Sequence, residues 1–417
     1  MESPQIQPEL KPYVIDPTGS EVLIREAAAL RERGPVTQVE LPGGVIAWSI
    51  TSAALMRQLL TDSRVSKDAS QHWPRFQNGE IGPEWPLFIW VAVQNMFTAY
   101  GKEHTRLRRL VAPAFTARRT RTIAPRVEAI ARHLLDGVAA AGASGEPVDL
   151  REAFAYPLPI QVIGELLGVA EEHRAELKVL VDGVFNTTLT PEESVANGER
   201  LYGMIASLVA GKRATPEDDL TSDLISQHGE DGSSLTEQEL CDTVMLIISA
   251  GYDTTVNLID QIIYTLLTRP DQLKLLREGG VSWSDIIEET LRAAAPVAHL
   301  PLRYAVTDID LTKSAGVVIR QGEAILMSYG VANQDPAWHG DTAAEFDAAR
   351  ERHDHLAFGY GTHLCLGAPL ARLEVGTGLP MLFDRFPNLR LACDPGELGH
   401  NPSFITNGHD RLPVLLA

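Results

Sequence analysis

The chain has 417 residues, 22% of them charged, and a formal net charge of −19. This acidic balance excludes a general affinity for nucleic acid, which requires a basic surface. Its three cysteines lie far apart, as expected in a reducing compartment, and no apolar run reaches the ~18–20 residues that would cross a bilayer. No linker rich in Pro, Gly or Ser divides the sequence, so we expect one domain over residues 1–417, in the cytoplasm and without membrane contact.

The N-terminal part predicts short strands followed by an irregular segment. Residues 36–41 and 45–50 are rich in apolar and β-branched side chains and flank the sequence PGG, which indicates a β-hairpin. Residues 51–61 are typical of a short helix. Residues 71–100 have no regular period but hold three of the six tryptophans, and so long an irregular segment with large apolar side chains is unusual.

A basic segment comes next. Between residues 102 and 126 the sequence has eight Lys or Arg and one acidic residue, Glu103, which reverses the overall charge. His104 and Arg108 are four residues apart and share one face if residues 104–115 are helical. The segment is either a solvated basic helix or a surface that attracts an acidic partner protein, with one face that binds carboxylates.

Helices dominate the middle of the chain. Residues 125–142, 159–167, 171–185 and 191–213 have helical periodicity and predict the helical body. The capping box of Thr236 and Glu239 begins the longest helix, which continues to about Thr268 and would be roughly 50 Å long. Its centre, VMLIISAG, is apolar on all sides and therefore buried.

Polar residues follow directly in the middle of that buried helix, in the sequence GYDTT from Gly251 to Thr255. Glycine and threonine are poor helix formers, and a buried carboxylate is costly. Such a local cost usually marks a functional site. The alternative for Thr254 is a hydrogen bond back to the preceding turn of the helix.

The C-terminal third mixes a helix, strands and a loop. Residues 283–294 predict a helix in which Glu289 and Arg292 share a face, a spacing that is weak when taken alone. Residues 300–330 and 388–417 are the other parts expected to be rich in strands. The loop FGYGTHLCLG, residues 358–367, precedes an apolar segment that predicts a helix.

Cys365 in this loop has glycines on either side, which leave an open approach for a flat macrocycle. The free N–H groups at the start of the following helix would stabilise a thiolate. Haem iron held by one thiolate is the chemistry that suits this arrangement. Two alternatives are a buried structural cysteine and a zinc site. The zinc site would use four ligands, namely His353, His355, His363 and Cys365.

The loop FGYGTHLCLG matches the cysteine-ligand signature of the cytochrome P450 family, and further matches run from about Val36 to the C-terminus. The sequences QNMFTAYG and HTRLRRLVAPAFTARRTR resemble those of actinobacterial members that hydroxylate steroids and macrolides. The resemblance implies the cytochrome P450 fold, a mainly α (α+β) architecture. It has a large helical body, a long central helix and small β-sheets.

The resemblance also implies roles for individual residues. Cys365 would be the iron ligand, and Asp253 and Thr254 would relay protons to dioxygen. The other residues expected at the haem are His104, Arg108, Ala250, Gly251, Arg303, Phe358, His363 and Gly367. Those expected to contact substrate are Phe88, Phe185, Leu246, Ser249, Ala250, Val297, His299, Leu300 and Thr406. Glu289, Arg292 and Arg350 would form a structural triad under the cysteine loop, and Gln334 departs from the arginine that many relatives carry.

The activity that the resemblance implies is monooxygenation of a hydrophobic small molecule by a haem b protein that consumes dioxygen. A steroid is the favoured substrate, with a macrolide or other polyketide as the alternative. The sequence has no dinucleotide-binding fingerprint. Electrons would therefore come from NAD(P)H through a separate ferredoxin and ferredoxin reductase, and the protein would be a monomer. The rival from another class is a haem-based gas sensor or carrier without turnover.

Overall fold

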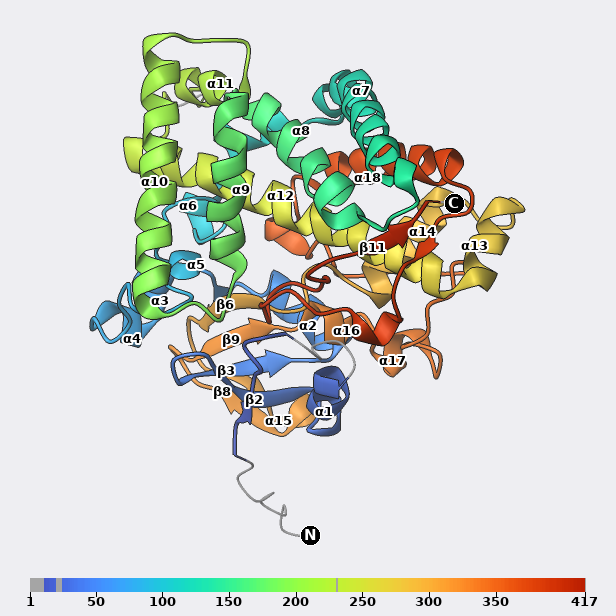
Figure 1. Cartoon of the computed structure of the whole chain (residues 1–417). Coiled ribbons are helices and arrows are strands. Elements are labelled where there is room, and N and C mark those ends of the chain that lie inside the picture. Colours follow the sequence, from blue (N-terminus) through green and yellow to red (C-terminus); the bar gives the residue numbers. More distant parts are fainter. Residues whose placement is uncertain (1–10, 20–24, 230–231, 417) are drawn as a thin grey trace.

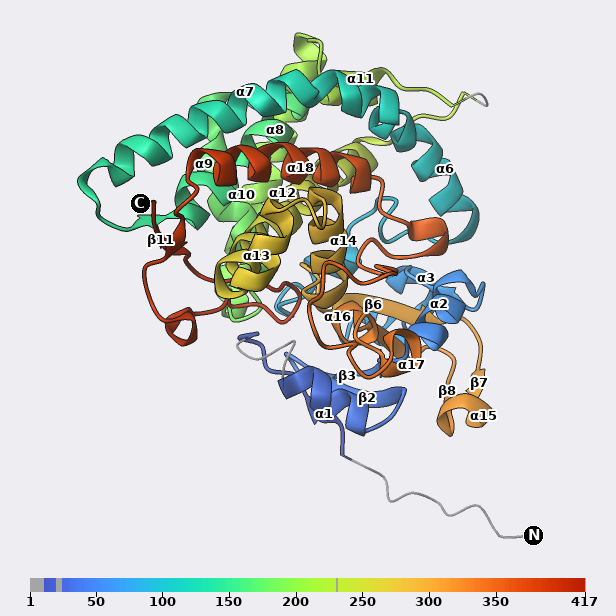
Figure 2. The ribbon, with the colours of Figure 1, turned by 90° about the vertical axis from the view of Figure 1, so that its right-hand side faces the viewer.

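The computed structural model describes residues 11–19, 25–229 and 232–416. Figures 1 and 2 show helices gathered on one side of the molecule and the largest sheet on the other, with α12 crossing between them. The longer helices are α2 (Ala53–Thr61), α6 (Gly101–Val111), α7 (Ala117–Ala141), α8 (Pro157–Leu167), α9 (Glu171–Phe185), α10 (Pro191–Ala214), α12 (Glu237–Thr268), α13 (Pro270–Arg277), α14 (Trp283–Ala293) and α18 (Ala368–Arg385). The shorter helices are α1 (Ala27–Glu32), α3 (Ala69–His72), α4 (Pro74–Gln77), α5 (Ile89–Ala92), α11 (Leu220–Ser226), α15 (Thr312–Ala315), α16 (Tyr329–Ala332) and α17 (Pro336–His339).

The described residues form three sheets beside these helices, with strand orders β1-β2-β3-β9-β6-β4, β10-β11-β5 and β7-β8. The strands are β1 (Tyr13–Val14), β2 (Val36–Leu41), β3 (Val45–Ile50), β4 (Val65–Ser66), β5 (Val148–Asp149), β6 (Leu300–Ala305), β7 (Ile309–Leu311), β8 (Val317–Ile319), β9 (Ala324–Met327), β10 (Arg390–Leu391) and β11 (Pro413–Leu415). The predicted hairpin is confirmed: β2 and β3 pair antiparallel from Val36 with Ile50 to Leu41 with Val45. Gly43 and Gly44 make the turn with φ of +79° and +72°, which glycine adopts without a steric penalty.

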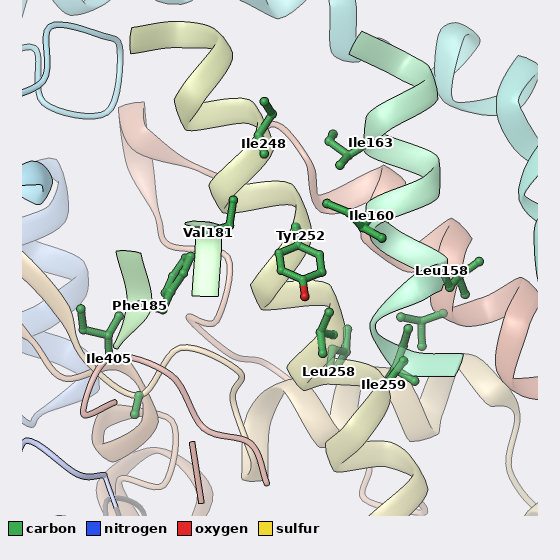
Figure 3. Packing of buried hydrophobic residues seen from close by; sticks show 14 of the residues in the cluster. Leu158, Ile160, Ile163, Val181, Phe185, Ile248, Tyr252, Leu258, Ile259 and Ile405 are labelled. Carbon is green, nitrogen blue, oxygen red and sulfur yellow. The ribbon is translucent and has the colours of Figure 1, made fainter. Parts of the chain in front are cut away.

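The long central helix is also confirmed. The Thr236 hydroxyl accepts the Glu239 N–H, and the Glu239 carboxylate accepts the Thr236 N–H, so the predicted capping box begins α12. The helix ends at Thr268, before Pro270. Figure 3 shows the core around it, with Ile248, Tyr252, Leu258 and Ile259 from α12, Leu158, Ile160 and Ile163 from α8, and Val181 and Phe185 from α9.

Two predicted elements differ from the structure. Helix α7 begins eight residues before Pro125, which therefore lies inside the helix instead of starting it. The segment 71–100 is not wholly irregular, because α3 ends inside it and α4 and α5 form within it. Trp73 and Trp85 bury themselves against each other there, with ring centroids 5.6 Å apart. Packing of large apolar side chains thus orders short helical turns that no periodicity predicts.

Among the described residues, no single helix has both the length and the apolar composition to cross a membrane. The segments Arg151–Leu167 and Glu171–Phe185 pass that test only as a pair, and the pair is bent by 117°.

Candidate active site

Cys365 lies on the wall of a cavity between α12 and the loop that precedes α18. The loop folds back on itself, because the Cys365 N–H donates to the Phe358 carbonyl oxygen at 2.9 Å. Gly359 and Gly361 both have φ of +74°. A Cβ atom on Gly361 would lie 2.9 Å from the Leu60 carbonyl oxygen, so this turn requires glycine for its conformation and for the close approach of α2.

The surroundings of the Cys365 thiol fit a metal ligand. Burial raises the pKa of the Cys365 thiol, although the Gly367 and Ala368 N–H groups and the Arg108 guanidinium act in the opposite direction. The protein alone therefore does not ionise the sulfur completely, whereas a bound cation deprotonates a coordinating thiol outright.

Zinc is a poor match, because no group of three His, Cys, Asp or Glu among the described residues could hold a metal ion. The His355 ring Nε2 is instead hydrogen-bonded to the Glu288 carboxylate at 3.0 Å. The alternative of a four-ligand zinc site at His353, His355, His363 and Cys365 is therefore wrong.

Basic side chains line the same cavity. Arg108, Arg303 and His363 are on its wall, and the buried His104 ring lies against His363 with centroids 4.1 Å apart. Burial, reinforced by Arg108 and Arg303, lowers the pKa of His104 to about 4. No carboxylate among the described residues forms a salt bridge with Arg108 or Arg303, so this cluster fits a ligand that carries its own carboxylates, as haem does.

Helix α12 forms the opposite wall, with Leu246, Ser249, Ala250, Gly251 and Thr254. The Thr254 hydroxyl donates to the Ala250 carbonyl oxygen at 2.6 Å, which is the back-bond considered as the alternative for this residue. A Cβ atom on Gly251 would lie 3.0 Å from Ile163, so the glycine also lets α8 pack closely on α12.

Asp253 is buried and lies outside the cavity wall. Its carboxylate accepts a hydrogen bond from the Asn257 amide at 2.8 Å. The Asn257 side-chain oxygen in turn accepts from Arg151 and Asn401, at 2.8 and 2.9 Å. Burial raises the pKa of Asp253 to about 7, against the opposing charge of Arg151. At neutral pH this carboxylate therefore exists in both protonation states, as a proton relay requires.

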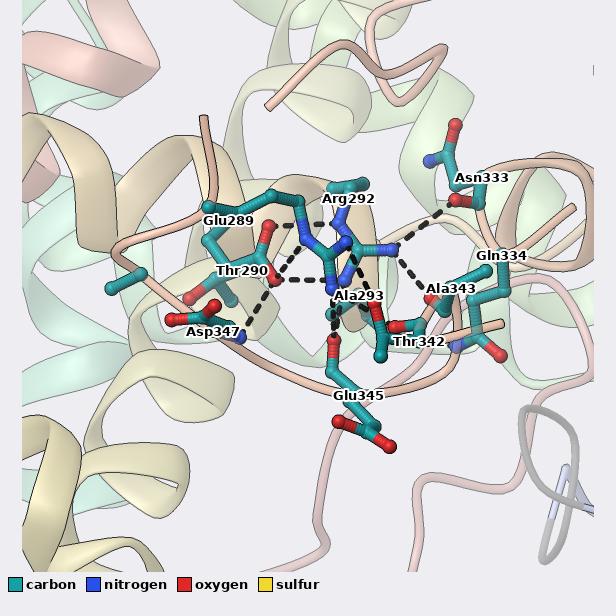
Figure 4. A network of polar contacts seen from close by, with 12 residues as sticks. Glu289, Thr290, Arg292, Ala293, Asn333, Gln334, Thr342, Ala343, Glu345 and Asp347 are labelled. Carbon is teal, nitrogen blue, oxygen red and sulfur yellow. Dashed lines mark hydrogen bonds and ion pairs between the residues drawn. The ribbon is translucent and has the colours of Figure 1, made fainter. Parts of the chain in front are cut away.

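The Glu289 and Arg292 side chains form a buried pair with two hydrogen bonds of 2.7 Å (Figure 4). Arg292 also donates to the carbonyl oxygens of Ala343 and Glu345, and Glu289 accepts the Asp347 N–H at 2.9 Å. Arg350 lies 3.4 Å from the same carboxylate. The structure thus brings the three predicted triad residues together beneath the segment that leads to the cysteine loop.

Neighbouring contacts extend this support. The Asn333 side chain accepts the Leu356 N–H at 2.7 Å, and Gln334 donates to the Ala293 carbonyl oxygen at 2.7 Å. Gln334, which stands where many relatives carry arginine, therefore still connects this loop to α14. A second ion pair, which was not predicted from the sequence, joins Arg372 to Glu288 at 2.6 Å.

Three residues expected to contact substrate do not line the cavity. Phe88 stacks on Phe76 instead. His299 is buried between Ser328 and Glu26, with hydrogen bonds of 2.8 and 3.0 Å. Thr406 is buried as well, and its neighbour Ile405 reaches the wall. In extended segments successive side chains face opposite sides, so Leu300 and Ile405 point to the cavity while His299 and Thr406 point away.

The remaining predicted contacts are on the wall, which holds Phe185, Leu246, Ser249, Ala250, Val297 and Leu300. Further lining residues come from α5 and the segment after it, namely Ile89, Trp90, Val93, Met96 and Phe97. Trp90 and Phe97 belong to the aromatic segment that the resemblance places at the pocket wall, whereas reasoning from sequence missed Ile89, Val93 and Met96. It also missed Lys67, a buried cation on the wall. The aromatic content of residues 71–100 was the available signal for the first group, but no local pattern distinguishes which of its side chains reach the cavity.

Comparisons with known proteins agree with this geometry. The family model described as Cytochrome P450 matches residues 204–279 and 283–396. The 2-hydroxy-5-methyl-1-naphthoate 7-hydroxylase of Streptomyces carzinostaticus is 43% identical over 407 residues, 97% of each chain. CYP154A1 from Streptomyces coelicolor A3(2) has a structure similar to this one with a TM-score of 0.92 at 56% identity, covering 97% of this chain and 100% of that chain.

A testosterone-bound CYP154C4 from Streptomyces sp. ATCC 11861 gives a TM-score of 0.93 at 42% identity, covering 98% of this chain and 99% of that chain. The comparisons thus define a mainly helical fold with small β-sheets. The chain belongs to the cytochrome P450 family, in its actinobacterial branch. It is a monooxygenase that acts on a small molecule, which excludes the sensor or carrier without turnover. The family implies a haem prosthetic group and redox partners.

Proposed function

We propose that this cytochrome P450 hydroxylates a rigid, polycyclic, hydrophobic substrate, with a steroid as the first candidate. The observation that carries the proposal is the aromatic part of the cavity wall. Trp90, Phe97 and Phe185 meet there, with the Trp90 ring centroid 6.1 Å from Phe97 and 5.2 Å from Phe185. Flat aromatic faces suit a flat apolar ligand.

The aromatic cluster is joined to the end of α9. The Trp90 indole N–H donates to the Val184 carbonyl oxygen at 3.2 Å, which connects α5 to α9. Asp242 of α12 accepts the Gln94 N–H at 2.6 Å and ties the segment after α5 to the central helix. These contacts hold the aromatic wall in place, so its shape would select a rigid ligand over a flexible one.

In the proposed reaction, dioxygen, two electrons and two protons convert a C–H bond of the substrate to C–OH and release water. Haem, when bound through Cys365, would supply the oxygen activation. His104, Arg108, Arg303 and His363 would hold its carboxylates. Asp253 would take a proton on its carboxylate and pass it towards the Thr254 hydroxyl, and the apolar wall would orient the substrate and exclude water.

Electrons would come from a ferredoxin and its NAD(P)H-dependent reductase. The exposed residues Lys102, Arg109 and Arg121 on α6 and α7 support this proposal, because an acidic electron donor would be attracted to them. Two other arginines of the segment are neutralised, since Arg106 pairs with Glu239 and Arg126 with Glu165.

The test is a titration of the purified ferric protein with testosterone, progesterone, a macrolactone and a hydroxynaphthoate. The proposal predicts a shift of the haem absorption spectrum with the steroids. With a surrogate ferredoxin and reductase, the same steroids should give a product one oxygen atom heavier, labelled from ¹⁸O₂. A spectral shift and product with the macrolactone alone would replace the steroid by the polyketide alternative.

A second candidate substrate, a fused-ring aromatic acid, is favoured by the relative that acts on a naphthoate. A shift and product with the hydroxynaphthoate alone would select it. In the same experiment, Cys365→Ser should lose the long-wavelength carbon monoxide band that thiolate ligation gives to the ferrous protein. If the variant keeps that band, Cys365 is not the ligand.

A further inference from the structure

Lys67 and Arg303 face each other across neighbouring strands. Strands β4 and β6 pair antiparallel, with Val65 opposite Ala305 and Ser66 opposite Tyr304. Continued one residue beyond the end of β4, this register would bring Lys67 opposite Arg303, whose charge acts on Lys67. Like charges in directly opposed positions destabilise a sheet, so this pairing requires a compensating negative charge.

Lys67 is deeply buried, with 4% of its surface exposed. Its ammonium lies 3.6 Å from the centroid of the Phe97 ring, a contact that only partly replaces the lost hydration. Among the described residues it has no hydrogen-bonding or carboxylate partner. Burial and then Arg303 lower the pKa of Lys67, which reflects the same missing anion.

Another buried lysine, Lys212, has the carboxylate partners that Lys67 lacks in the described part of the chain. Lys212 is 8% exposed, and its ammonium lies 2.5 Å from Glu217 and 2.6 Å from Asp219. This is the usual arrangement, since buried charges are paired. Lys67 departs from this arrangement, because its neighbours Arg303 and His363 are basic residues and offer no carboxylate to pair with its ammonium.

The position of Lys67 indicates where its anion would come from. Lys67 and Arg303 line the same cavity as Cys365 and Arg108. We infer that Lys67, together with Arg303, binds a carboxylate of the haem and is a cofactor-binding residue of this protein. This inference rests on the haem site proposed above. A carboxylate between the two cations would form charge-assisted hydrogen bonds with both and remove their repulsion.

The test replaces Lys67 in the haem-loaded protein. Lys67→Met and Lys67→Gln should release haem to excess apomyoglobin about tenfold faster, because a hydrogen bond between charged groups is lost. The reduction potential of the haem should become more negative, since removing a nearby positive charge disfavours the added electron. Lys67→Arg keeps the charge and should stay close to the wild type in both measurements.

The matched control is Lys212→Met, which removes a buried lysine outside the cavity. It should lower the unfolding midpoint and leave the reduction potential unchanged. Faster haem loss from Lys67→Met at an unchanged potential would show a merely structural role and overturn the inference. Unchanged haem loss combined with weaker binding of an acidic substrate would assign the site to a substrate carboxylate and also overturn it. A wild-type protein that binds no haem would instead contradict the proposed function.

Discussion

Asp253 is a carboxylate that the protein keeps buried beside one amide donor. Its pKa is raised to about 7 by burial, while Arg151 opposes this increase and Asp182 adds to it. The groups that face it come from four parts of the chain: Asn257 on α12, Arg151 before α8, Asp182 on α9, and Thr406 in the C-terminal segment. A group with this pKa can gain and lose a proton in each turnover without a large free-energy cost.

We therefore expect Asp253→Asn to lower the turnover number by roughly 10²-fold, the usual contribution of a positioned proton donor. Wild-type turnover should fall as the pH rises through about 7, because the protonated carboxyl is depleted, and the variant should lose this dependence. The measurement is product formation between pH 6 and 9. The spectral shift with substrate should be unchanged, and a variant that keeps the wild-type profile would rule out Asp253 as the donor.

Gly361 shows how one residue sets the position of the cysteine loop. It has φ of +74°, and an added Cβ would approach the Leu60 carbonyl oxygen to 2.9 Å. Gly316 has a nearly equal φ of +72° in the left-handed region but nothing within 4 Å of an added Cβ. Comparing the two glycines separates the cost of the backbone conformation from the cost of the close contact.

Gly316→Ala should lower the free energy of unfolding by about 1 kcal/mol, the cost of a left-handed conformation. Gly361→Ala should cost more, because α2 must also move, and it should reduce the haem content of the purified protein. Urea denaturation and the absorbance ratio of haem to protein measure the two effects. Equal costs for the two variants would show that the contact with Leu60 is not limiting.

Among the elements, the buried ion pair of Glu289 and Arg292 connects α14 to the segment 343–347. Through Asn333 it also connects α14 to the residues just before Phe358. Both side chains are wholly buried, so neither charge can be hydrated if its partner is lost. Breaking such a pair usually costs about 3–5 kcal/mol, whereas an exposed pair contributes less than about 1 kcal/mol.

Arg292→Ala should therefore destabilise the protein by about 3–5 kcal/mol, with loss of haem, because the Glu289 carboxylate remains buried and unpaired. Arg320→Ala is the control, since Arg320 forms an ion pair of 2.7 Å with Asp308 at the surface. It should change the free energy of unfolding by less than about 1 kcal/mol. Chemical denaturation of both variants provides the comparison, and similar small changes would contradict a structural role for the triad.

At the scale of the whole molecule, the distribution of charge matters more than its sum. The chain carries a net charge of −19, yet α6 and the start of α7 present Lys102, Arg109 and Arg121 to solvent. Arg108, next to Arg109 on α6, donates to the Leu364 carbonyl oxygen in the cysteine loop at 2.7 Å. An acidic donor protein that binds this surface would therefore lie close to Cys365.

Arg109→Glu should slow reduction by an acidic ferredoxin by roughly tenfold at low salt, because electrostatic steering controls the encounter rate. The difference from wild type should shrink as ionic strength rises. Stopped-flow reduction at several salt concentrations tests this. Arg213→Glu, on the exposed face of α10, is the control and should leave the rate unchanged; an equal effect of both variants would indicate general charge repulsion.

The sequence by itself determined the features that depend on residues near one another in the chain. The turn of Gly43 and Gly44, the capping box that begins α12 and the glycines around Cys365 each follow from local backbone geometry. The tertiary structure alone decided which side chains face the cavity. His299 and Thr406 turn into the core because neighbouring residues of extended chain face opposite sides, and Lys67 meets Arg303 because two strands far apart in the sequence pair. Such placements depend on long-range packing, which no short stretch of residues encodes.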